Sequence, residues 1–446
     1  MTSQKNQSKS DQLRRFYQCF SGKGALPLAP DDLYYVRRLE ETAEKDPIRA
    51  LSDRIEWAES ESVHLLTGFR GNGKSTELLR LKKLLEKSGC VVFLVDMLKY
   101  VLMTKPIAIS DFTLSLMAAL SDAVEESADC HLKPLREGYG ARLMNFLTGK
   151  IELGETTIKS PVADIGLKLQ TDTTFKEKIQ QSLAGHTTQL VADAHKFVDD
   201  LVTAIRREKG KADLKVVLLV DSMEQLRGVG ESAQQLYDSV VELFSGQAAN
   251  LDYPKLHVVY TVPPFLPILS KNLGRALDGH PISQWPNIHV RGRDGQGDEA
   301  GLGIMKRLVA QRFSDWEEIV PEDFLNQLAI WSGGDMRDFF RLLREFALIV
   351  RTLREKNPEA APGEDVVSRV VQQLRNELLP IAKDDARWLA EIHTTKQASL
   401  ANTKALPDLA RFFDSNLIMN YQNGEPWFDI HPVIEEEVKR MSTETD

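Results

Sequence analysis

The chain has 446 residues, of which 42% are hydrophobic and 27% are charged, and its formal net charge at pH 7 is −9. This length exceeds what one ordinary core accommodates, so we expect two or three domains, and the composition is that of a soluble globular protein. The negative net charge argues against nucleic-acid binding by the chain as a whole. It does not argue against binding through a local basic face.

We expect neither a membrane span nor a secretory signal. The apolar runs all fall short of the thickness of a bilayer, and the chain begins with the polar stretch MTSQKNQSKS. Its three cysteines, Cys19, Cys90 and Cys130, lack the spacing of a metal site or a redox pair, which fits a reducing cytosol. These features predict a cytoplasmic protein.

The N-terminal residues 1–45 are predicted to form a helical segment. Residues 1 to about 12 are polar and expected to be disordered, and Asp31-Asp32 is predicted to cap a helix over residues 33–44. Asp46-Pro47 begins a further helix, because proline suits the first helical position. The core domain is predicted to start here and to run over residues 46–295.

A glycine-rich loop follows in the stretch LLTGFRGNGKST, residues 65–76, which contains the pattern G-x-x-x-x-G-K-[ST] between a predicted strand and a predicted helix. The glycines let successive N–H groups point at phosphate oxygens, and the helix adds the positive end of its dipole. We expect Lys74 to reach the β- and γ-phosphates and Ser75 to ligate Mg²⁺. The sequence predicts a site for ATP and Mg²⁺ formed by Gly68, Gly71, Asn72, Gly73, Lys74, Ser75 and Thr76. Residues 46–50 are a candidate pocket for the adenine base.

The strands of a parallel sheet come next. Residues 216–221, VVLLVD, form a buried strand that ends in Asp221, as a Walker B element requires, and this carboxylate would act on Mg²⁺ opposite Ser75. Strands over residues 90–96, 256–261 and 287–290 alternate with helices, which predicts an α/β sheet wrapped by helices. Residues 150–170 alternate apolar and polar positions, so we predict a hairpin within an insertion at about 145–210; a partner-binding arm and a packed insertion both remain open.

Two residues near the sheet edge are candidates for catalysis. Ser222 follows Asp221 where many motor ATPases have glutamate, and Glu224 lies two positions further on. Glu224 is our candidate base for the attacking water, with a solvated loop carboxylate as the alternative. Thr261, at the end of its strand, is placed to hydrogen-bond the γ-phosphate or the water, or it satisfies backbone groups inside the sheet.

Arginines outside the loop offer a further set of candidates. Arg337 begins a predicted helix of a helical lid over residues 296–383, where it would sense the γ-phosphate, and a surface ion pair is the alternative. Arg275, Arg291 and Arg293 flank the last predicted strand, so any of them could act in trans as an arginine finger in a homo-oligomer.

Residues 384–446 are predicted to form a winged-helix-like domain. Two helices precede apolar strands joined by Asn423-Gly424, which is a strong hairpin signal. From residue 381 onward the chain holds seven Lys or Arg and twelve Asp or Glu, and Asp408 and Asp414 lie on the predicted recognition helix. Phosphate contacts need cations, so we favour a protein contact over DNA binding.

The loop at 68–76, the strand-borne Asp221, Thr261 and the segment Gly333–Arg337 together resemble an AAA+ ATPase. The core, lid and winged helix resemble the replication-initiator (Orc/Cdc6-like) and STAND branches, and the small Ser222 resembles the NACHT-type Walker B pattern. The resemblance spans roughly residues 46–440, without a counterpart for the insertion. Val262-Pro263 after Thr261 departs from the arginine of many STAND proteins, and their repeat array is absent from this sequence.

From this resemblance we expect an ATP-dependent molecular switch with slow hydrolysis that controls an effector on a separate chain. The resemblance also implies, loosely, a bacterial anti-phage or stress-response system. A DNA-binding AAA+ ATPase of the initiator or loader kind is the alternative, and a nucleotide-bound scaffold with negligible hydrolysis is a third hypothesis.

Overall fold

The computed structural model describes residues 2–21, 26–39, 45–127, 185–228, 232–269, 279–400, 402–422 and 425–443, with single positions at 171, 172, 174, 177, 273 and 277. The hairpin predicted at 150–170 lies outside the described residues, as do Cys130, Arg275 and the turn Asn423-Gly424. Among the helices that are described, none is long and apolar enough to cross a membrane.

A five-stranded parallel sheet with the strand order β2-β3-β4-β1-β5 forms the centre of the larger domain. Every residue of β1, β3 and β4 is buried, which is what a parallel sheet covered on both faces requires of its central strands. The α/β fold predicted from the sequence is therefore confirmed. The strands are β1 (Val63–Gly68), β2 (Val91–Asp96), β3 (Val216–Asp221), β4 (Leu256–Val262) and β5 (Ser283–Trp285).

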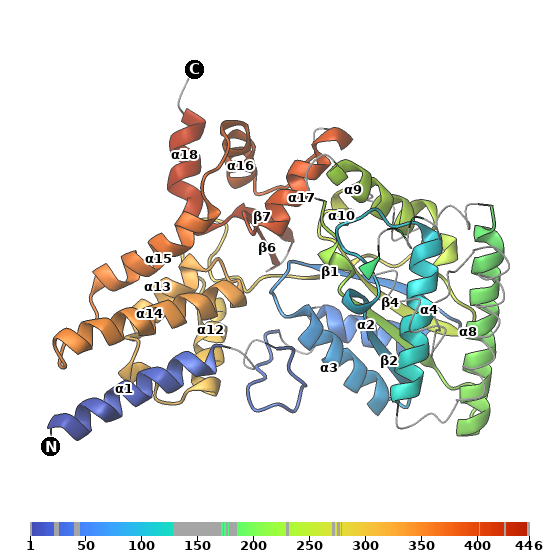
Figure 1. The fold of residues 1–446 in the computed structure, drawn as a ribbon, viewed down its shortest axis with the longest axis horizontal. Helices are drawn as coiled ribbons and strands as arrows, with labels where there is room; N and C mark the ends of the chain where they lie inside the picture. Colours follow the sequence, from blue (N-terminus) through green and yellow to red (C-terminus); the bar gives the residue numbers. More distant parts are fainter. Residues whose placement is uncertain are drawn as a thin grey trace.

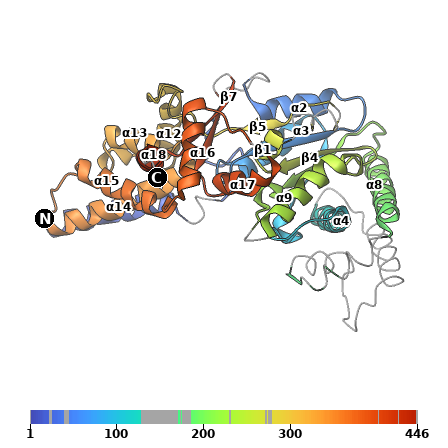
Figure 2. The ribbon, with the colours of Figure 1, turned by 90° about the horizontal axis from the view of Figure 1, so that it is seen from above.

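Helices cover both faces of this sheet (Figure 2). One face carries α2 (Pro47–Trp57) and α3 (Lys74–Lys87), and the other carries α4 (Ile109–Glu126), α8 (Thr187–Lys209) and α9 (Ala233–Val241). The short α10 (Leu266–Leu269) follows β4. Helix α8 buries a stripe of apolar residues, so this part of the predicted insertion packs against the domain.

The lid consists of α12 (Glu299–Arg312), α13 (Glu322–Trp331), α14 (Met336–Lys356) and α15 (Glu364–Leu378). Helix α1 (Thr2–Cys19) lies along α14, so the start of the chain belongs to the lid (Figure 1). Phe16 of α1 packs against Phe313 of the lid, and Phe20, just after the helix, packs against Phe340. The predicted disorder of residues 1–12 is wrong for the backbone from Thr2 onward, because the apolar residues that follow anchor this helix.

The C-terminal unit has the predicted order of helix, helix and hairpin, in α16 (Lys383–Thr395), α17 (Leu406–Asp414), β6 (Ile418–Gln422) and β7 (Pro426–Ile430), followed by α18 (Glu435–Thr443). Helix α17 packs against α9 of the sheet domain. The ring of Phe413 on α17 meets the ring of Phe69 edge to face at 5.1 Å. The C-terminal unit therefore touches the glycine-rich loop directly.

Two predicted elements are wrong. The first described residues of the predicted helix 33–44 are irregular, and Asp32 Oδ1 accepts the N–H of Tyr34 at 2.8 Å, so it closes a local turn instead of capping a helix. Residues 287–290 are not a strand, because the edge strand is β5, a few residues earlier. Ile288 instead donates its N–H to Gly334 O of the lid.

Candidate functional site

The glycine-rich loop between β1 and α3 curls over its own lysine. Gly71 and Gly73 have φ values of +93° and +85°, a left-handed conformation that glycine adopts at little cost. Lys74 is buried, and its Nζ donates to Gly68 O at 2.9 Å and to Phe69 O at 2.8 Å. The same Nζ lies 3.2 Å from Glu224 Oε1. The loop therefore has the closed shape that a phosphate-binding loop needs.

A cavity of about 650 Å³ opens beside this loop. Its walls come from the loop and the start of α3, from the ends of β2 and β3, from the N-terminal segment, and from the lid. Of the sequence-predicted site residues, it is lined by Gly71, Gly73, Lys74, Ser75, Thr76, Asp221, Glu224 and Arg337. The structure thus brings eight of these candidates to one place.

The acidic end of the cavity has the donor set of a divalent cation site. The Ser75 side chain lies beside Asp221 and favours its charged form, and Ser222 in a left-handed conformation directs its N–H to Asp221 Oδ1 at 2.8 Å. Burial, and then the nearby carboxylate of Glu224, raise the pKa of Asp221. Glu224 Oε2 is buried and has no hydrogen-bond partner among the described residues. Two neighbouring buried carboxylates beside a serine hydroxyl fit a hard cation such as Mg²⁺.

Two arginines add positive charge to the same cavity. Arg70 and Arg337 both line it, together with Lys74. Burial and then the charge of Arg337 lower the pKa of Arg70, since a cation is disfavoured beside another cation. A polyanion such as a triphosphate would relieve this repulsion, so these residues fit the ligand that the loop predicts.

Gly68, Asn72 and Thr261 do not line the cavity, although all three were predicted to act there. Gly68 contributes its carbonyl to Lys74, and Asn72 Nδ2 donates to Trp285 O at 2.7 Å. Thr261 is fully buried, and its Oγ1 accepts the N–H of Met223 at 3.0 Å. Thr261 therefore hydrogen-bonds a backbone group, which was the alternative to contacting the phosphate or the water. The bond supports the turn that carries Glu224.

The lid reaches the loop through the first turn of α14. Asp335 caps this helix, because its Oδ1 accepts the N–H groups of Arg337 and Asp338, each at 2.9 Å. A side chain on Gly71 would approach within 3.3 Å of Arg337 Nε, so the sensor candidate lies against the loop. Burial, and then the neighbouring carboxylate of Asp338, raise the pKa of Asp335.

The segment over residues 26–39 lines much of the cavity, and sequence reasoning missed it. Leu28 donates its N–H to Thr76 Oγ1 at 3.1 Å, and Leu26, Pro27, Tyr34 and Val36 face the cavity with Phe340 of the lid. Residues 46–50, the predicted base pocket, do not line it. Asp46 instead binds the guanidinium of Arg80 through two oxygens, at 2.6 and 2.7 Å. The segment carries no motif, so only its apolar residues could have suggested this role.

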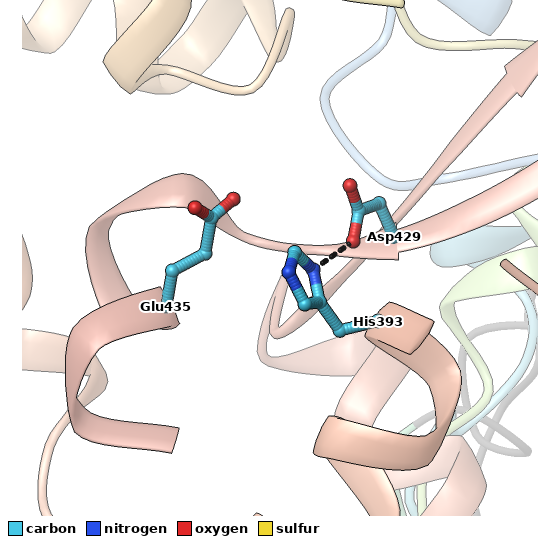
Figure 3. Close-up of side chains that lie close together, drawn as sticks. All are labelled: His393, Asp429 and Glu435. Atoms are coloured by element: carbon cyan, nitrogen blue, oxygen red, sulfur yellow. Dashed lines mark hydrogen bonds and ion pairs between the residues drawn. The ribbon is translucent and has the colours of Figure 1, made fainter. Parts of the chain in front are cut away.

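A second polar cluster lies in the C-terminal unit, where His393, Asp429 and Glu435 come close enough to be metal ligands (Figure 3). His393 Nδ1 lies 2.7 Å from Asp429 Oδ1. Burial alone would raise the pKa of Asp429, but the hydrogen bond to His393 and the charges of Arg291 and Lys396 hold it below its usual value. Since Arg291 and Lys396 already pair with these carboxylates, we interpret the cluster as an ion-pair network without need of a metal.

Arg291 is therefore unsuited to act as a trans finger, which corrects that prediction. It is buried and held by Asp429, Glu435 and the carbonyl of Ile430 within its own chain. Arg293 is exposed, with a 3.4 Å contact from Nη2 to Glu425 O, and it stays a candidate. Arg275 lies outside the described residues.

No model of a known protein family matches the sequence, and no curated protein matches it. Among solved structures, ORC2 of Aeropyrum pernix is similar in its ADP form (10% identity, TM-score 0.40, 95% of this chain and 97% of that chain) and in its ADPNP–ADP complexes (11%, 0.41, 95% and 95%). Cdc6p of Pyrobaculum aerophilum is similar at 11% identity and a TM-score of 0.36, over 95% of this chain and 97% of that chain. These superpositions are too loose to assign a family or a function.

We predict that Arg291→Met lowers the free energy of unfolding by about 3 kcal/mol, because it leaves the buried carboxylate of Asp429 with fewer cations. Urea unfolding of the full chain measures this change. Arg293→Met is the matched control and should change stability by less than about 0.5 kcal/mol. A variant at Arg291 with unchanged stability but reduced turnover would instead support a finger in trans.

We predict that Asp335→Asn is more stable than the natural chain at pH 8 and that this advantage disappears below about pH 4. Asparagine still caps α14 but cannot ionise. Because the pKa of folded Asp335 is raised, the folded state holds its proton more tightly than the unfolded state, and stability falls as pH rises from about 4 through the folded pKa. Thermal unfolding across pH tests this, with Asp335→Ala as the variant that loses the cap. An advantage of Asn that does not vary with pH would contradict the prediction.

Proposed function

We propose that this chain binds ATP with Mg²⁺ in the cavity beside the glycine-rich loop, hydrolyses it slowly and acts as a molecular switch of the AAA+ type. The observation that carries this proposal is the meeting, in one cavity, of the loop lysine, the Ser75–Asp221 pair, Glu224 and the lid arginine Arg337. A turn of glycines with a chance lysine would not be expected to collect these partners from four separate elements.

Each residue has a role that its position supports. The N–H groups of the loop and Lys74 would hold the phosphates, and Ser75 and Asp221 would hold Mg²⁺, which supplies positive charge to the transferred phosphoryl group. Glu224 would orient the attacking water and accept its proton. Arg337 would contact the terminal phosphate, so that the lid position depends on the ligand. The turn at Ser222 sets Glu224 back from the strand end, which favours slow turnover.

A switch also needs contacts that couple the cavity to a surface where a partner binds. The loop contacts the lid at Arg337 and the C-terminal unit through Phe69 and Phe413. A ligand that binds better to one arrangement of these units shifts the population toward it. The expectation of an effector on a separate chain, and of a role in anti-phage defence, comes from the sequence resemblance.

DNA binding through the C-terminal unit is not favoured. Its predicted recognition helix, α17, packs against α9, and Phe412, Phe413 and Leu409 on it are buried. Asp414 lies beside Tyr237 in the same contact. A helix that is buried in this way must leave the sheet domain before it can enter a major groove. A filter-binding titration at low salt that detected tight DNA binding would reverse this preference.

We predict that Lys74→Ala weakens ATP binding by at least 10- to 100-fold, the loss expected for a charged hydrogen-bond donor to phosphate. Isothermal titration calorimetry with Mg²⁺ and ATP measures the dissociation constant. Lys82→Ala, at a partly exposed lysine of the same helix that does not line the cavity, is the matched control and should bind like the natural chain. Full affinity in Lys74→Ala would remove the basis of the proposed function.

We predict that Glu224→Gln lowers ATP turnover by roughly 10²- to 10⁴-fold, because glutamine cannot accept the proton of the water. ATP affinity should be kept or improved, since the buried site loses one negative charge next to the phosphates. Phosphate release under single-turnover conditions separates the two quantities. Equal turnover in both proteins would favour the scaffold hypothesis, in which Glu224 has no catalytic role.

A further inference from the structure

The N-terminal segment over residues 26–39, here called the strap, connects the two domains that flank the cavity. Helix α1 before it packs on the lid, and α2 after it packs on α3 of the sheet domain. The strap binds the lid where Gln311 Nε2 donates to Leu33 O at 2.5 Å and Arg312 Nη1 donates to Tyr34 O at 3.2 Å. With Leu28 bonded to the helix after the loop, both sides of the cavity hold this segment.

Near the end of the strap, Arg38 is buried against the glycine-rich loop. Its side chain is 8% exposed, and its guanidinium carbon lies 5.0 Å from the centre of the Trp285 ring. Nη1 donates to Asn72 O at 2.5 Å, and Nη2 donates to Pro286 O at 2.8 Å. Burial lowers the pKa of Arg38 to about 10, although the negative charges of Glu77 and Asp335 act to raise it. The group therefore stays charged at neutral pH.

The Asn72 carbonyl is the informative contact, because it lies between the two left-handed glycines of the loop. Trp285 Nε1 donates to the same oxygen at 2.9 Å. In a planar trans peptide, the C=O of one residue and the N–H of the next point in opposite directions. Two donors that fix the Asn72 carbonyl therefore also fix the direction of the Gly73 N–H. Glycine could otherwise rotate this peptide at little cost.

The second contact of Arg38 reaches the connection to the lid. Pro286 follows β5 directly, and the next residues bind the other units, with Asn287 N–H on Asn420 O and Ile288 N–H on Gly334 O. Arg38 thus ties the loop to the start of the lid connection. A side chain that served only to fill space would not need two aligned carbonyl acceptors.

We propose that Arg38 is a positioning residue of the phosphate site: it holds the Asn72–Gly73 peptide so that the Gly73 N–H is presented to a phosphate oxygen. This inference rests on the proposed function, because it assumes that the loop binds a nucleoside triphosphate. It adds the strap, a segment without any motif, to the parts of the chain that the site requires.

The test compares ATP affinity and turnover in the natural chain, Arg38→Ala, Arg38→Lys and the matched control Arg37→Ala, whose arginine is the exposed neighbour. Arg38→Ala should bind ATP about 10- to 100-fold more weakly, the loss expected for one or two charge-assisted hydrogen bonds. Arg38→Lys keeps the buried charge but can serve one carbonyl well, so its affinity should lie in between. Arg37→Ala should stay within about twofold of the natural chain.

Chemical rescue separates positioning from a purely structural role. Guanidinium chloride at low millimolar concentration should restore part of the ATP affinity of Arg38→Ala but none of that of Lys74→Ala, with potassium chloride as the ionic control. Circular dichroism of each variant gives its folded fraction. If Arg38→Ala does not fold, the intermediate affinity of a folded Arg38→Lys carries the test.

Two results would overturn the inference. One is an Arg38→Ala protein, or failing that an Arg38→Lys protein, that binds ATP as tightly as the natural chain. The other is a loss of affinity that follows the folded fraction and that guanidinium does not restore. A natural chain that does not bind ATP at all would overturn the proposed function itself, so the two failures are distinguishable.

Discussion

The lid contacts the glycine-rich loop at two positions that have no side chain, Gly71 and Gly73. A Cβ on Gly73 would come within 2.7 Å of Met336 Cε, and one on Gly71 would lie 3.3 Å from Arg337 Nε. Their positive φ values also give the loop its closed curve. The same two glycines therefore give the loop its curve and leave room beside it for the first residues of α14. A larger residue at either position would be strained by the positive φ and would make the Met336 or Arg337 side chain move.

Close contact with the loop is a property of all the surrounding units. The strap reaches it through Arg38, the sheet edge through Trp285, the lid through Arg337, and the C-terminal unit through Phe413 on Phe69. Tightly packed interfaces respond to small displacements by moving between discrete arrangements. A loop held from four directions is therefore well placed to report on its ligand, which supports a switch more than a simple binding site.

The sequence predicted the features that depend on neighbouring residues, and it did not predict the contacts between residues that are far apart in the chain. The strand that ends in Asp221 is a continuous apolar run, and the loop pattern is specific, so both were predictable. The edge strand was misplaced because Ser283-Gln284-Trp285 has no periodicity of its own and pairs with β1 across more than 200 residues of chain. Arg291 was predicted to be available for a contact in trans and Arg38 was not singled out, because the groups that bind both arginines lie far away in sequence.

The contacts of Lys74 suggest how ligand binding and catalysis could be linked. An ammonium group has three donors, and here they meet the carbonyls of Gly68 and Phe69 and the carboxylate of Glu224. Under the proposed function, phosphate oxygens need some of the same donors, and a shared lysine can serve both anions only in part. Phosphate binding would then draw Lys74 from Glu224 and leave both oxygens of that carboxylate free to hold a water molecule. The residue that recognises the triphosphate would in this way also prepare the residue that acts on the water.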